Sequence, residues 1–152
     1  MNIGGFLPKP LFVPVSLAVG ALLGLGLVAL AVQAAQDTKK IEIVIKDGTV
    51  KSLSGYTLTG TLTEISVRNE DTMIHGFNSS LFTPDMKVEM SGGSLAPGKG
   101  PHVYRVNAGK TLVLKFTTPR LDDNRSFAFW CDIHPSMKGE MLVVEVTGPD
   151  GG

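Results

Sequence analysis

A seven-residue segment near the C-terminus of the chain, residues 131–137, concentrates side chains that could bind a soft metal ion. It places a thiol, an imidazole and a thioether at Cys131, His134 and Met137, directly after an aromatic, strand-like stretch. Sulfur donors combined with imidazole suit copper, and two histidines with one cysteine and a weak axial methionine form an electron-transfer type of site. We therefore expect copper chemistry in this segment.

Such a site needs a second histidine from another part of the chain. The sequence has three histidines, so His75 and His102 remain as candidates. It also has a single cysteine, which excludes an internal disulfide and leaves the Cys131 thiol unpaired. A buried, purely structural cysteine is the alternative interpretation. The nearby His134 and Met137 favour a metal ligand instead.

The first part of the chain is apolar and differs from the remainder. Residues 11–35 carry no charge and are rich in Leu, Val, Ala and Gly, and Lys9 is the only basic residue before them. This pattern predicts an export signal over residues 1–35, with cleavage after Ala31 or after Ala34. The apolar run also reaches the ~20 residues that span a bilayer, so an uncleaved membrane anchor is the open alternative. In both cases we expect an exported, periplasmic domain, either soluble or tethered to the membrane.

Residues 36–152 are long enough for one domain with a single core. All 14 acidic residues lie there together with 13 of the 14 basic ones, because Lys9 belongs to the leader, and the net charge is −1. No basic stripe is present that would favour nucleic-acid binding. We expect a monomeric domain whose partners are proteins.

Alternation of apolar and polar residues predicts strands in this domain, and no segment has a sustained helical period. The expected strands are Ile41–Lys46, Leu62–Arg68, His102–Val106, Thr111–Thr117, Phe127–Cys131 and Met141–Val146. Asp47-Gly48 is a turn signal, Ser91–Pro101 is expected to be loop, and Phe82–Met90 is compatible with a loop, a short helix or an edge strand. Short strands between turns, in a chain of this length, predict an all-β, antiparallel two-sheet sandwich.

The sequence resembles the cupredoxins, the family of plastocyanin, pseudoazurin and amicyanin. The Cys-x₂-His-x₂-Met pattern of residues 131–137, with Pro135 after the histidine, is similar to the short ligand loop of amicyanin in particular. Asn69, five intervening residues and His75 match the Asn-x₅-His spacing of the family. The resemblance covers most of residues 41–146 and leaves the leader outside.

The resemblance implies a cupredoxin-like Greek-key sandwich with one copper ion that alternates between Cu(I) and Cu(II). It implies four copper ligands, three equatorial and the last one axial: His75, Cys131, His134 and Met137. Met141 competes for the axial role, but it begins an apolar strand and is expected to be a core residue. His102 is expected to be a loop or surface histidine.

One position departs from the pattern of the family. Typical members have an asparagine after the first histidine, whereas this chain has Gly76. Hydrogen bonds around metal ligands tune the reduction potential and the ligand orientation, so we expect both to differ here. Asn78 and Ser79 are the candidates to replace the missing side chain.

The resemblance implies a protein that is not an enzyme and that carries single electrons between exported redox proteins. Three histidines are too few for a multicopper oxidase, and one cysteine is too few for a binuclear copper site. Two alternatives stay open: a copper chaperone or storage module, and an atypical catalytic site in which Met137 does not coordinate. By family analogy, electrons are expected to pass near His134, through an apolar patch that includes Pro135 and Ser136.

Overall fold

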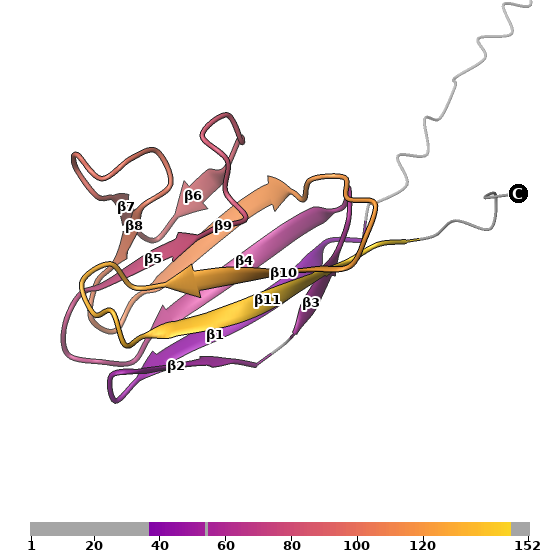
Figure 1. The fold of residues 1–152 in the computed structure, drawn as a ribbon. Helices are drawn as coiled ribbons and strands as arrows, with labels where there is room; N and C mark the ends of the chain where they lie inside the picture. The colour runs from indigo at the N-terminus through magenta and orange to yellow at the C-terminus, as the bar shows by residue number, and fades with distance from the viewer. Residues whose placement is uncertain (1–36, 54, 147–152) are drawn as a thin grey trace, which may run out of the picture. The chain divides into compact units, whose positions relative to one another are not determined.

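The structure is a computed structural model that describes residues 37–53 and 55–146 of the chain (Figure 1). The predicted leader, residues 1–35, lies outside the described residues, and so does the question of its cleavage. Every regular element of the described part is a β-strand. None of its residues forms a helix that is long and apolar enough to cross a membrane.

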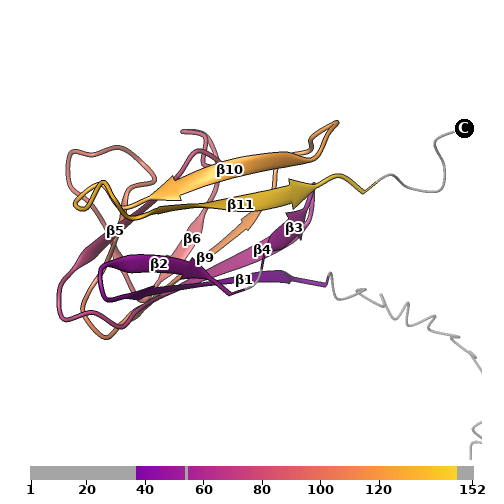
Figure 2. The ribbon, with the colours of Figure 1, turned by 60° about the horizontal axis from the view of Figure 1, so that its bottom comes forward.

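Eleven strands in the described residues form two sheets. In chain order they are β1 (Lys39–Lys46), β2 (Thr49–Ser52), β3 (Tyr56–Leu58), β4 (Leu62–Asn69), β5 (His75–Ser79), β6 (Glu89–Ser91), β7 (Ser94–Leu95), β8 (Tyr104–Val106), β9 (Thr111–Thr117), β10 (Arg125–Trp130) and β11 (Lys138–Val144). The strand orders are β2-β1-β4-β9-β6 and β3-β11-β10-β5-β8-β7. Figure 2 shows the two layers, with β10 and β11 in one and β1, β2 and β4 in the other.

The predicted all-β, two-sheet sandwich is confirmed, and the pairing within the sheets adds one feature. Each sheet contains one parallel pair, β1 with β4 in the first and β3 with β11 in the second, among antiparallel neighbours. The sheets are therefore mixed rather than purely antiparallel. Alternation could not reveal this, because side chains alternate with a period of two residues in both kinds of pairing.

Several element bounds differ from the sequence-based expectation. The strand expected from His102 begins only at Tyr104, and the strand expected to reach Cys131 ends at Trp130. The expected loop after Ser91 contains the short strand β7, and β6 lies at an edge of the first sheet, so an edge strand is right for the end of Phe82–Met90. Strands of two to four residues are too short to display alternation, which is also why β2 and β3 were not predicted.

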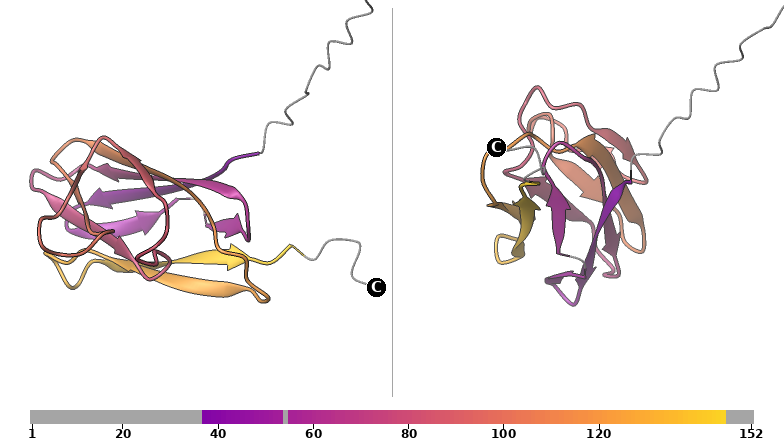
Figure 3. Two further views of the ribbon diagram at one scale, coloured as in Figure 1. Left: turned by 90° about the horizontal axis from the view of Figure 1, so that it is seen from above. Right: turned by 90° about the vertical axis from the view of Figure 1, so that its right-hand side faces the viewer.

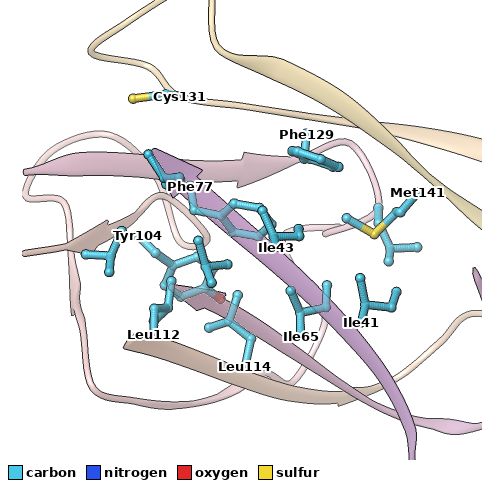
Figure 4. Packing of buried hydrophobic residues seen from close by; sticks show 14 of the residues in the cluster. Ile41, Ile43, Ile65, Phe77, Tyr104, Leu112, Leu114, Phe129, Cys131 and Met141 are labelled. Atoms are coloured by element: carbon cyan, nitrogen blue, oxygen red, sulfur yellow. The ribbon is translucent and has the colours of Figure 1, made fainter. Parts of the chain in front are cut away.

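The core lies between the two layers and fills with the inward-facing residues of each strand. The residues that β1, β4 and β9 contribute to the core cluster are Ile41, Ile43, Ile45, Ile65, Val67, Leu112, Leu114 and Phe116. They meet residues of the second sheet such as Phe77, Phe129 and Met141, as Figure 4 shows. Burial of this many branched side chains supplies the main stabilisation of the sandwich.

The pairing of β5 with β10 determines what lies together at one end of the sandwich. Trp130 pairs with Asn78 and Phe129 with Ser79 in antiparallel register. Continuing that register past the end of β10 brings the following loop alongside the start of β5. The loops at this end lie opposite the end at which β11 stops (Figure 3, left). Two segments far apart in sequence thereby meet.

Candidate metal centre

Three of the four predicted ligands lie together at this end of the sandwich. The ligand atoms of His75, Cys131 and His134 all lie within 4.8 Å of one another. Cys131 Sγ is 3.6 Å from His134 Nδ1 and 4.0 Å from His75 Nδ1, and the two Nδ1 atoms are 3.2 Å apart. Both imidazoles therefore present the same ring nitrogen to the thiol, as ligands of a single ion do.

The cluster is closed on one side and open on the other. His75 and Cys131 are 1% and 2% exposed, whereas His134 is half-buried. Beside these ligands in sequence, the apolar side chains of Ile74 and Ile133 are exposed, each at 42%. The His134 side of the cluster is therefore its approach to the surface.

Backbone hydrogen bonds close the ligand loop on itself. The Cys131 N–H donates to Met137 O at 2.9 Å, and the Met137 N–H donates to His134 O at 2.9 Å. Met137 is buried, so its side chain packs inward from the loop. Met141 is a buried core residue, as expected, and Figure 4 shows it at the side of the cluster away from Cys131. Coordination by Met137 stays a prediction.

Gly76 makes room for an ion pair beside the cysteine. Its N–H donates to Cys131 Sγ at 3.1 Å, so the backbone of β5 holds the sulfur in place. A Cβ atom at Gly76 would lie 2.0 Å from Asp132 Oδ1 and 2.8 Å from Arg105 Nη1. Arg105 and Asp132 form a bidentate ion pair, with N–O distances of 2.7 and 2.8 Å. The asparagine typical of the family would therefore require the Arg105 and Asp132 side chains to move.

The Arg105 guanidinium also affects the electrostatics of the loop. Its hydrogen bonds hold the pKa of Asp132 below the ordinary value, against the opposing effect of burial. The pair connects β8 to the ligand loop, because Arg105 lies on β8 and Asp132 follows Cys131. No sequence pattern indicated this pair, because a lone arginine on an alternating strand is usually exposed to solvent.

The two residues expected to replace the missing asparagine have another task. Asn78 Nδ2 donates to Trp130 O at 3.4 Å, and Ser79 Oγ donates to Ala128 O at 3.0 Å. Both side chains therefore tie β5 to β10. Asn78 also forms a hydrogen bond with Asp132, so it supports the ion pair rather than contacting the ligands.

A carboxylate outside the predicted ligand set contacts the first histidine. His75 Nε2 lies 2.8 Å from Asp71 Oδ2. Asp71 also accepts the backbone N–H groups of Asp47, at 2.6 Å, and Gly48, at 3.2 Å. Burial acts to raise the pKa of Asp71, but the hydrogen bonds from Gly48, His75 and Asp47 outweigh it and the pKa is lowered. The available signal was an aspartate four residues before a histidine in a turn-forming segment.

Asn69, the first residue of the Asn-x₅-His spacing, organises the loop that leads to His75. Its Nδ2 donates to Met73 O at 2.8 Å and to Val106 O at 3.0 Å, and its Oδ1 accepts the Asp71 N–H at 2.9 Å. These bonds fix the chain between β4 and β5. The spacing thus has a structural cause in this protein.

His102 is not part of the cluster. It lies in a loop, as expected, but it is half-buried, and its Nδ1 is 2.9 Å from the Tyr104 hydroxyl. Its ring also packs near Phe82, with ring centroids 5.7 Å apart. Of the two candidate histidines, the structure brings only His75 to Cys131 and His134.

The donor set fits copper. A thiolate and two imidazole nitrogens from His75, Cys131 and His134 converge within one metal-sized region, and soft sulfur with imidazole is a combination that copper prefers. The Gly76 N–H lies at the sulfur, and the Asp71 carboxylate at the far side of His75 orients the ring so that Nδ1 faces the other donors.

No protein-family model and no curated protein sequence matches the chain. Its fold is similar to that of McoA, a multicopper oxidase from the hyperthermophile Aquifex aeolicus, with a TM-score of 0.52 and 11% identity over 73% of this chain and 30% of that one. A multicopper oxidase from Pediococcus acidilactici gives a TM-score of 0.50 and 17% identity over 80% and 28%. A reduced mutant of amicyanin gives a TM-score of 0.40 and 16% identity over 70% of this chain and 82% of amicyanin.

The chain spans about 30% of the length of the multicopper oxidases that it matches. At identities this low, the similarity concerns the fold, and multicopper oxidases contain cupredoxin domains. The protein therefore has a cupredoxin-like fold. In that fold, His75, Cys131 and His134 form a cluster that could bind a metal, which supports a copper protein.

Proposed function

We propose that this chain holds one copper ion and carries single electrons between redox proteins. The observation that carries the proposal is the convergence of His75, Cys131 and His134, whose donor atoms lie within 4.8 Å of one another. A bound copper ion would supply a one-electron Cu(I)/Cu(II) couple. Met137, held inward by the backbone bonds of the loop, is the proposed axial ligand.

Rigid support of the donors favours electron transfer. His75 belongs to β5, Cys131 accepts a hydrogen bond from Gly76, and the loop back to Met137 is closed by backbone bonds. Donors that cannot move far keep nearly one geometry in both oxidation states, so little rearrangement accompanies the transfer of an electron. A storage site for Cu(I) would gain nothing from this fixation.

The number of metal-ligating residues favours an electron carrier over a multicopper oxidase. No second group of metal-ligating residues exists in residues 37–53 and 55–146, and the third histidine, His102, is bonded to Tyr104. The three histidines of the printed sequence cannot supply the additional copper centres that a multicopper oxidase needs. If Met137 coordinates, the ion has four protein ligands, and no position is left for a substrate.

Exchange with partners is proposed at the His134 side. His134 is half-buried, and the neighbouring Ile133 and Pro135 are exposed. An apolar surface around the ligand edge allows close, short-lived contact with another redox protein, and such patches mark interaction sites. We further propose that the partners are exported proteins, in keeping with the apolar residues 11–35.

Electrochemistry tests the proposal. The full chain is loaded with Cu(II) and examined by voltammetry, with oxygen consumption in the presence of ascorbate measured in parallel. We expect a reversible one-electron wave, no catalytic oxygen consumption, and loss of the wave in Cys131→Ala. Binding of Cu(I) without a reversible wave would support copper storage, and sustained oxygen consumption would support a catalytic site.

A further inference from the structure

We propose that Asp71 is a positioning residue for the metal centre. Its carboxylate, which accepts hydrogen bonds from the β1–β2 turn, fixes His75 as the Nε2–H tautomer and turns Nδ1 toward Cys131. The inference rests on the proposed function, because it describes how the chain tunes that same site. It goes beyond the ligand set, since Asp71 contacts a ligand and not the metal.

The Asp71 carboxylate receives three hydrogen bonds. Oδ1 accepts the Asp47 N–H at 2.6 Å, and Oδ2 lies 3.2 Å from the Gly48 nitrogen and 2.8 Å from His75 Nε2. The side chain of Asp71 is 13% exposed and that of His75 is 1% exposed. The contact with the ring is therefore shielded from water, and both partners of the ring contact are fixed.

The turn that holds Asp71 has an unusual backbone. Asp47 and Gly48 have φ angles of 51° and 65°, so both residues of the β1–β2 turn are left-handed. Two such residues form the hairpin turn that matches strand twist, and Asp-Gly is a preferred pair for it. The Asp71 segment is also fixed through its main chain, because the Glu70 N–H donates to Ile45 O at 2.8 Å. A rigid hairpin thus anchors the carboxylate.

The bond to Asp71 determines the state of the His75 ring. An ionised carboxylate only accepts hydrogen bonds, so Nε2 carries the proton and Nδ1 keeps its lone pair. A carboxylate on the outer nitrogen also makes the imidazole a stronger donor to a metal. A stronger, more negative ligand environment favours Cu(II) over Cu(I). His134 has no carboxylate among its hydrogen bonds in the described residues, where its Nδ1 lies near His75 and Cys131.

The residue at this position must offer two acceptor oxygens. Asp71→Asn replaces one oxygen by an NH₂ group, which cannot accept the N–H of Asp47, of Gly48 or of the ring. If the NH₂ group faces the ring, it donates to Nε2 and moves the ring proton to Nδ1, the atom that faces Cys131. If it faces Asp47, the negative charge is lost and the Asp47 N–H loses its acceptor.

The test compares Asp71→Asn with Asp123→Asn in the full chain. Asp123 is a matched control, because it is an exposed aspartate paired with Arg125 at 3.0 Å. We expect Asp71→Asn to weaken Cu(II) binding by ~10- to 100-fold, measured by competition with a chelator, and to raise the reduction potential. The Cu(II) affinity of Asp123→Asn should stay within about twofold of the wild-type value. Unchanged affinity and potential in folded Asp71→Asn would overturn the proposal.

A second measurement separates this inference from the copper assignment. ¹⁵N NMR of the copper-free full chain reports which nitrogen of His75 is protonated, and in the wild type this readout needs neither copper nor a variant. We expect the Nε2–H tautomer in the wild type and a shift toward Nδ1–H in Asp71→Asn. An Nδ1–H tautomer in the wild type would overturn the role of Asp71. Absence of copper binding together with the Nε2–H tautomer would overturn the proposed function and leave the positioning role standing.

Discussion

The two halves of the metal centre are held in different ways. His75 enters from β5, is almost completely buried, and is bonded to a carboxylate that a hairpin turn fixes. Cys131, His134 and Met137 come from a short loop that its own backbone bonds close, and His134 reaches toward the surface. The strand half is therefore buried like core residues, whereas the loop half lies at the edge of the site and reaches the surface.

This difference separates two requirements of the site. The strand half sets the orientation and the charge of one ligand, whereas the loop half supplies the sulfur donors and the route to a partner. The Arg105–Asp132 ion pair and the Gly76 N–H join the halves, because each bridges from β5 or β8 to the ligand loop. Variants at these bridges, and within each half, test the comparison.

The largest effect is expected where the halves touch most closely. Gly76→Ala places a Cβ atom 2.0 Å from Asp132 Oδ1, so the ion pair or the strand must shift. Overpacking of this kind costs ~3 kcal/mol of the free energy of unfolding, measurable by urea titration. Gly55→Ala is the control, because its added Cβ meets nothing within 4 Å, and it should change stability by less than ~0.5 kcal/mol. Equal stability of the two variants would contradict the close packing of Gly76 against Asp132.

Breaking the ion pair should have the next largest effect. Arg105→Gln removes the partner of a mostly buried carboxylate and should lower the free energy of unfolding by ~2 kcal/mol. Asp132→Asn in the same background should add little, since the two residues act together. Full additivity of the two substitutions would show that the pair does not couple β8 to the loop.

The same pair predicts a pH dependence with a definite sign. Hydrogen bonds from Arg105 lower the pKa of Asp132 in the folded state. Its stabilisation is therefore fully present above the ordinary aspartate pKa of ~3.9 and is lost as the pH falls through the lowered value. In urea unfolding of the copper-free protein, the free energy of unfolding should fall less below pH ~4 for Arg105→Gln than for the wild type. An identical loss in both proteins would contradict the assignment.

Within the loop half, Met137→Leu separates packing from coordination. The substitution nearly conserves volume and should cost less than ~1.5 kcal/mol of stability. Loss of an axial thioether should raise the reduction potential by about 59 mV or more, equivalent to tenfold in a one-electron equilibrium. Met141→Leu in the core is the control and should leave the potential unchanged. A potential that responds to Met141 but not to Met137 would reassign the axial ligand.

The smallest effect is expected on the outer surface of β10. Trp130 is 39% exposed and precedes the buried Cys131. Trp130→Phe should change the free energy of unfolding by less than ~0.5 kcal/mol and leave the visible spectrum of the copper-loaded protein unchanged. A changed spectrum would show that the outer face of β10 also affects the geometry at Cys131.

The sequence predicted the residues that meet but not the residues that hold them. His75, Cys131 and His134 could be selected because ligand chemistry restricts residue type and spacing, and the chain has few alternatives. Asp71 and Arg105 could not be selected, since an acidic turn residue and a strand arginine are ordinary surface features. Their roles depend on contacts across sequence separations of 24 and 27 residues.

The fold shows the same limit. Alternation identified the long strands β1, β4 and β9, whose inward residues form the core. It did not identify β2 and β3, and it did not distinguish parallel from antiparallel neighbours, because pairing is decided by packing between distant segments. The turn at Asp47-Gly48 was predicted from local chemistry, whereas its bond to Asp71 was not.

The most direct test of the account is the visible absorption spectrum of the full chain with Cu(II), before and after a reductant, beside Cys131→Ala. We predict an intense thiolate-to-copper band in the red for the wild type, which reductant bleaches and reoxidation restores, and no such band for the variant. Absence of the band in a folded, copper-loaded wild-type protein would contradict the electron-carrier site formed by His75, Cys131 and His134.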